Sequence, residues 1–139
     1  AAKYLKLSDK RLKGFVPPEG VPDKVMHQYA GAYLAEHEFG ITDEDILNAI
    51  RYHTSGRAGM SDLEKLIFLS DMLEEGRKFE GVDKLRKLFA EDMDKCLECA
   101  LHDELGFLKE SGGDIYPLTQ EAYDYIKKQN AEKQVQKTE

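Results

Sequence analysis

The sequence predicts an all-α fold, a bundle of about six to seven helices. Apolar residues recur with a helical period over most of the chain, and capping residues stand where helices should begin and end. No alternation of apolar and polar residues extends beyond four positions, and the intervening segments are short. We therefore expect one helical domain over residues 1–130, followed by a disordered polar tail at 131–139.

The first elements are bounded by prolines and glycines. A short amphipathic piece at 8–15 precedes the segment 17–22, whose three prolines exclude a helix. A helix is expected from Asp23 to near Gly40, because glycine suits the position after a helix end. Thr42 with Asp45 predicts the start of the next helix, which should end within residues 53–56.

The second half follows the same logic. Ser61 and Glu64 have the spacing of a capping box, which predicts a helix that contains Asp71. After the loop 76–81 we expect a shorter helix and then a long one to about Glu110, with the last helix beginning at 117–119.

Bulk composition excludes several classes of partner. The net charge of −7 leaves no basic surplus for binding nucleic acid, although a few local cations can still bind a small phosphorylated ligand. No apolar stretch approaches the roughly 20 residues that cross a bilayer, so we expect no membrane partner. With two cysteines and no signal peptide, a cytoplasmic location is expected.

The two cysteines, Cys96 and Cys99, form a C-x-x-C pair inside a predicted helix. A zinc site would need further ligands, and only His102 is near in sequence. A redox pair normally follows a strand in a βαβ unit, which is absent from the pattern. We interpret both as structural thiols.

Three side chains that can bind metals fall on predicted core-facing helix stripes. Asp71 lies in the apolar run 66–73 at helical spacing from Ile67, so we expect it to point inward, where a lone charge requires a partner. His27 and His53 continue apolar stripes on two other helices. Imidazole and carboxylate suit iron, manganese, zinc and magnesium to differing degrees, so the three predict a metal site with positions open to water or phosphate.

Each of these residues also has a structural interpretation. A histidine on an apolar helix face is often a hydrogen-bonded core residue, and a mid-helix Asp can be held by a donor network. The other two histidines, His37 and His102, have acidic neighbours such as Glu36 and Glu104, and we expect both at the surface.

Several motifs resemble the YqeK family of HD-superfamily phosphohydrolases, and the resemblance covers about residues 1–127. They are the segments 27–34 (HQYAGAYL), 48–56 (NAIRYHTSG), 59–65 (GMSDLEK), 69–77 (LSDMLEEGR) and 79–83 (FEGVD). The resemblance implies an HD-type helical domain that hydrolyses diadenosine tetraphosphate symmetrically to two ADP at a binuclear, usually iron, centre. It implies that His27, His53 and Asp71 are metal ligands and that Asp71 acts in catalysis, and it allows a homodimer.

One family feature is missing from this sequence. The HD superfamily takes its name from an adjacent His-Asp pair preceded by another histidine, and both should lie upstream of residue 1. Residues 1–5 resemble the continuation of an H-D-x-A-K pattern. We therefore expect an N-terminally incomplete HD-type domain.

Cations and a hydroxyl near the predicted ligands complete the expected site. Arg57 and Arg77 follow the helices of His53 and Asp71, where they can bind a polyphosphate, and Lys3 can do so as a point charge. Thr54 can donate at the pocket edge. All four can equally be ordinary surface or helix-end residues. Two other functions stay open: hydrolysis of mononucleotides at the same site, and a helical module that binds nucleotides without turnover.

Overall fold

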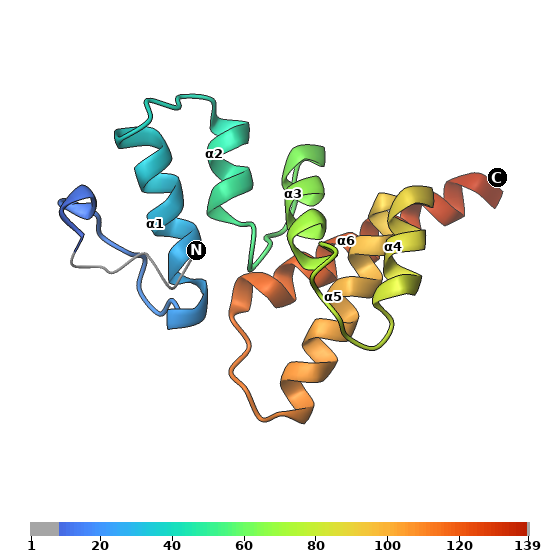
Figure 1. Ribbon diagram of the computed structural model, residues 1–139. Coiled ribbons are helices and arrows are strands. Elements are labelled where there is room, and N and C mark those ends of the chain that lie inside the picture. The colour runs from blue at the N-terminus through green and yellow to red at the C-terminus, as the bar shows by residue number, and fades with distance from the viewer. Residues whose placement is uncertain (1–8, 139) are drawn as a thin grey trace.

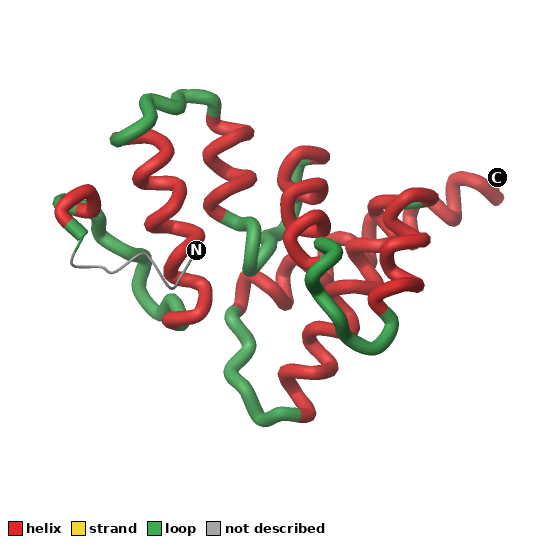
Figure 2. Tube along the Cα trace, in the orientation of Figure 1, coloured by secondary structure: helices red, strands yellow, loops and turns green. Residues whose placement is uncertain are grey.

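The computed structural model describes residues 9–138, and this part of the chain is all-α, as predicted (Figures 1 and 2). Its elements are a short 3-10 turn η1 (Lys10–Leu12) and the helices α1 (Asp23–His37), α2 (Glu44–Arg51), α3 (Asp62–Met72), α4 (Val82–Glu91), α5 (Met93–Glu110) and α6 (Pro117–Thr138). Lys3 lies outside the described residues.

The capping chemistry explains where the helices begin. The capping box of α3 is confirmed: Ser61 Oγ accepts from the Glu64 amide at 3.2 Å, and Glu64 Oε2 accepts from the Ser61 amide at 2.9 Å. The predicted cap of α2 is wrong by one residue. Asp43, whose carboxylate accepts from the amides of Asp45 and Ile46, takes the place we assigned to Thr42.

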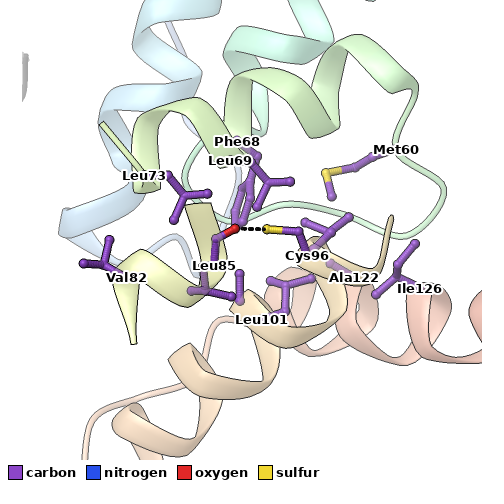
Figure 3. Packing of buried hydrophobic residues seen from close by; sticks show 12 residues of the cluster. Met60, Phe68, Leu69, Leu73, Val82, Leu85, Cys96, Leu101, Ala122 and Ile126 are labelled. Carbon is purple, nitrogen blue, oxygen red and sulfur yellow. Dashed lines mark hydrogen bonds between the residues drawn. The ribbon is translucent and has the colours of Figure 1, made fainter. Parts of the chain in front are cut away.

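Most helices pack against the next helix along the chain, whereas α3 packs mainly against α2 and α5. Figure 1 shows α1 and α2 side by side as an antiparallel pair, with α3 next to α2, α4 beyond α3, and α6 running behind α3 in this view. The main core lies between α3, α4, α5 and α6 (Figure 3). Its largest fully buried side chains are Phe68, Leu69, Cys96, Leu97, Leu101 and Ile126. This core fixes α3, which forms one wall of the site described below.

The structure supports the interpretation of both cysteines as structural thiols. Cys96 is buried in the core, where its Sγ donates a hydrogen bond to the Leu85 carbonyl at 3.3 Å (Figure 3). Burial raises the pKa of the Cys96 thiol to about 11, so it stays protonated near neutral pH. Cys96 and Cys99 are both free thiols.

The C-terminal segment differs from the expected disordered tail. Helix α6 continues to Thr138, and Figure 1 shows its end extending past the other helices. Residues 131–138 are rich in strong helix formers. Lys133 pairs with Asp94 of α5, and Asn130 Nδ2 donates to Glu98 Oε1 at 2.9 Å, so side chains on α5 hold this part of the helix.

Within residues 9–138, no helix combines the length and the apolar character needed to cross a membrane.

Candidate functional site

The structure brings the two predicted histidine ligands together. His27 lies on α1 and His53 follows α2, and their Nε2 atoms are 3.1 Å apart. The rings meet edge to face, with centroids 4.9 Å apart and planes inclined at 68°. Two residues 26 positions apart in sequence therefore form one pair because α1 and α2 pack as a hairpin.

His53 occupies a turn, because α2 ends earlier than we predicted. The helix stops at Arg51 and Tyr52 caps it, so His53 stands just outside the helix. Its Nδ1 lies 2.6 Å from the Ile50 carbonyl. Since a carbonyl only accepts, Nδ1 carries the proton, which in the neutral ring leaves the lone pair on Nε2. This is how proteins usually prepare a histidine to bind a metal.

A buried glutamine fixes this turn against α1. Gln28 is fully buried, and its Oε1 accepts from the amides of Thr54 at 3.1 Å and Ser55 at 3.0 Å. Its Nε2 donates to Ser55 Oγ at 2.8 Å. Because Gln28 neighbours His27 in sequence and Thr54 neighbours His53, these three bonds hold the two histidines in register.

The local environment keeps His27 neutral. Burial lowers the pKa of His27, and the adjacent His53 lowers it further. Thr54 Oγ1 lies 2.9 Å from His27 Nε2, so the hydroxyl group lies directly beside the histidine pair. A neutral imidazole is the form that can coordinate a cation.

Asp71 is exposed, which corrects the prediction that it points into the core. About half of its side-chain surface is accessible, and Ile67, one turn earlier, is also exposed. The apolar run 66–73 has apolar residues on more than one helix face, and only the face with Phe68 and Leu69 packs into the core. Asp71 instead faces Arg77, whose Nη2 is 3.6 Å from Asp71 Oδ2. Its role as a metal ligand stays a prediction.

A cavity of about 390 Å³ unites most of the predicted residues; we call it the histidine cavity. Its walls come from α1, α3, α5 and the loops after α2 and α3, and its lining residues are Lys24, His27, His53, Thr54, Phe68, Asp71, Met72, Arg77 and Glu104. Five predicted residues are therefore neighbours here: His27, His53, Thr54, Asp71 and Arg77.

Arg57 is not among the residues that line this cavity. Its Nε donates to Glu64 Oε1 at 2.7 Å and its Nη2 to Glu64 Oε2 at 3.0 Å, while its guanidinium lies 4.7 Å from the Tyr52 ring centroid. Glu64 is buried and needs this counter-charge. The structure thus favours the structural alternative for Arg57.

Two charged lining residues were not predicted: Lys24 and Glu104. We expected the segment around His102 at the surface, and His102 itself is exposed. Glu104 is half-buried, and burial raises the pKa of its carboxyl group. Its spacing of three residues after Leu101 and four before Leu108 places it on the apolar stripe of α5, which is the signal that could have identified it.

The histidine pair fits a metal ion in part. Imidazole nitrogens bind zinc at about 2.0–2.1 Å, so two ligands of one ion at 90–110° are about 2.8–3.4 Å apart. The observed 3.1 Å lies in that range. Two lone pairs at this distance repel each other unless a proton or a cation lies between them. Over the described range 9–138, however, no three His, Cys, Asp or Glu side chains cluster closely enough to complete a site.

Two known proteins that are similar to this chain carry the same name. The chain is 43% identical over 103 residues to the symmetrical bis(5′-nucleosyl)-tetraphosphatase of Bacillus subtilis (strain 168), and 42% identical over 104 residues to that of Halalkalibacterium halodurans. These matches cover 74% and 75% of this chain but 55% and 56% of the relatives. The chain therefore spans little more than half the length of the curated relatives that it matches. No family model matches it.

A solved structure extends the comparison to the fold. The crystal structure of a predicted HD superfamily hydrolase involved in NAD metabolism from Clostridium acetobutylicum superposes with a TM-score of 0.75 at 38% identity. The match covers 91% of this chain and 63% of that one. The six-helix arrangement of the described residues is thus an HD-superfamily arrangement. This chain is therefore a homologue of symmetrical bis(5′-nucleosyl)-tetraphosphatases, and its described residues share the fold of an HD-superfamily hydrolase.

Proposed function

We propose that the protein to which this chain belongs is a metal-dependent phosphohydrolase that cleaves diadenosine tetraphosphate symmetrically into two ADP. The observation that carries the proposal is the His27–His53 pair, 3.1 Å apart, in a cavity that Asp71 and Arg77 also line. The relatives named as symmetrical tetraphosphatases support the choice of substrate.

In this proposal His27 and His53 hold a metal ion, with Asp71 as a third ligand. The family resemblance favours a binuclear iron centre, and manganese, magnesium or zinc suit the same donors. When bound, such ions lower the pKa of a coordinated water and offset the charge on the phosphoryl oxygens. Within residues 9–138, no three His, Cys, Asp or Glu side chains lie close enough together to hold a metal ion by themselves.

The remaining lining residues act on the substrate and on the histidines. Arg77 is half exposed at the cavity and pairs only loosely with Asp71, so its guanidinium can turn to bind phosphate oxygens bidentately. Lys24 adds a second positive charge from the α1 wall of the cavity. Thr54 and Gln28 keep the two imidazoles in place, as described above.

Product analysis tests this function. The full-length protein, supplied with Fe²⁺ or Mn²⁺, is incubated with diadenosine tetraphosphate, and the nucleotides are separated by anion-exchange chromatography. We expect ADP alone, and we expect His53→Ala to abolish its formation. ATP with AMP would show asymmetric cleavage. Orthophosphate released from mononucleotides, with the tetraphosphate intact, would support the mononucleotide hydrolase, and binding without turnover would support the nucleotide-binding module.

A further inference from the structure

A second, smaller cavity of about 150 Å³ adjoins the histidine cavity; we call it the side cavity. It shares three lining residues with the histidine cavity, namely Lys24, Thr54 and Glu104. Its other walls are formed by Val25, Leu108, Asp114, Tyr116 and Thr119. A ligand with its charged part near the histidines can therefore extend past Glu104 into a space with largely apolar walls.

Glu104 stands at the junction of the two cavities with an unused hydrogen-bonding atom. Its Oε2 is shielded from solvent and has no hydrogen-bond partner within residues 9–138. Leaving a buried acceptor unpaired costs stability, so the fold gains nothing from this carboxyl group as it stands. A ligand that supplies hydroxyl donors at this point would remove the cost.

The far wall of the side cavity is held in place. The hydroxyl groups of Tyr116 and Tyr29 are 2.7 Å apart, and Tyr29 is buried on α1. This contact holds Tyr116 in place in the wall that it shares with Leu108 and Val25. A rigid aromatic ring and aliphatic side chains are suited to contact the face of a flat heterocycle.

We propose that the side cavity is the nucleoside subsite, in which Glu104 accepts hydrogen bonds from the ribose hydroxyls of the nucleotide. This inference rests on the proposed function, because it places the phosphates in the histidine cavity. The ribose follows the phosphates and meets Glu104 at the junction, and the base follows the ribose and meets Leu108 and Tyr116. Carboxylates are effective acceptors for vicinal ribose hydroxyls.

Calorimetric titration of the full-length protein with ADP and with 2′,3′-dideoxy-ADP tests the subsite, because the two ligands differ only in these hydroxyls. Wild type should bind ADP about tenfold or more tightly than the dideoxy compound. Glu104→Leu should bind ADP and the dideoxy compound with equal affinity, namely the weaker affinity that wild type has for the dideoxy compound. Glu104→Gln, which keeps an acceptor oxygen, should retain most of the preference. Glu110→Gln, at an exposed position of α5 outside both cavities, is the matched control and should behave as wild type.

Three outcomes would overturn the subsite. They are equal binding of both ligands by wild type, a ribose preference that survives in Glu104→Leu, and no ADP binding at all. A urea titration of Glu104→Leu shows that it folds, and we expect its stability to equal or exceed that of wild type. Tetraphosphate cleavage measured in parallel separates the two proposals. Cleavage without a ribose preference refutes only the subsite, and a ribose preference without cleavage refutes only the proposed function.

Discussion

Replacing Gln28 with methionine tests how the two histidines are held together. Methionine has a similar length and fills most of the same space, but it cannot accept from the amides of Thr54 and Ser55 or donate to Ser55 Oγ. Because the site is fully buried, water cannot readily replace the lost partners. The variant therefore removes hydrogen bonds while largely avoiding a new cavity.

The expected cost follows from the groups that are left unpaired. Ser55 is buried, so leaving its amide without an acceptor should cost about 1–3 kcal/mol of stability. The half-buried Thr54 amide can be partly hydrated, so leaving it without an acceptor should cost about 1 kcal/mol. The free energy of unfolding should therefore fall by about 2–4 kcal/mol. With a urea dependence of about 2 kcal/mol per M for a domain of this size, the midpoint should fall by about 1–2 M.

Urea unfolding followed by circular dichroism measures this difference. Gln136→Met, at an exposed position of α6, is the matched control and should stay within about 0.5 kcal/mol of wild type. A shift for Gln28→Met no larger than that of the control would refute the claim that Gln28 fixes the turn of His53.

Two further variants probe the cations. Arg57→Leu should destabilise the fold by about 3 kcal/mol, because it leaves the buried Glu64 carboxylate unpaired. Burial opposes ionisation of Glu64, but its hydrogen bonds to Arg57 and Ser61 outweigh burial and lower the pKa of Glu64. The stability from this pair is therefore fully present above the usual glutamate pKa of about 4.3 and is lost as the pH falls through the lower folded value. Urea midpoints from pH 7 to 3 should show this loss in wild type, and an unchanged loss in Arg57→Leu would contradict the assignment. Arg77→Ala should raise KM for the tetraphosphate about tenfold or more without reducing bound metal, whereas Lys78→Ala, the next exposed cation, should leave both unchanged. Loss of metal from Arg77→Ala would show that Arg77 supports the ligands instead.

The fold could be predicted from the sequence because its signals are local. The capping box at Ser61, the glycines after α1 and α5, and Pro117 each act within a few residues, and the helix boundaries follow them closely. The helical form of residues 131–138 could not be predicted from the tail alone, because the pairing of Lys133 with Asp94 joins residues 39 positions apart. Such a contact has no signature in the tail itself.

The site could be predicted only in part for the same reason. Apolar spacing predicted that His27 and His53 face the interior, but their convergence also depends on the turn after α2 in which His53 lies. The exposed position of Asp71 could not be predicted, because an apolar run that covers more than one helix face does not indicate which face is buried. The role of Arg57 was equally ambiguous, because the sequence had already explained its partner Glu64 as part of the capping box of α3. Only the three-dimensional structure shows that one carboxylate serves both Ser61 and Arg57.

The most direct test of the account is a calorimetric titration of the metal-free full-length protein with Mn²⁺, comparing wild type with His27→Ala, His53→Ala and the double variant. If both imidazoles bind one ion, each single variant should lose affinity at least tenfold, and the double variant should lose less than the sum of the two losses. His37→Ala, an exposed histidine on α1, should bind as wild type does. Wild-type affinity in either His27→Ala or His53→Ala would contradict the claim that the pair holds a shared ion.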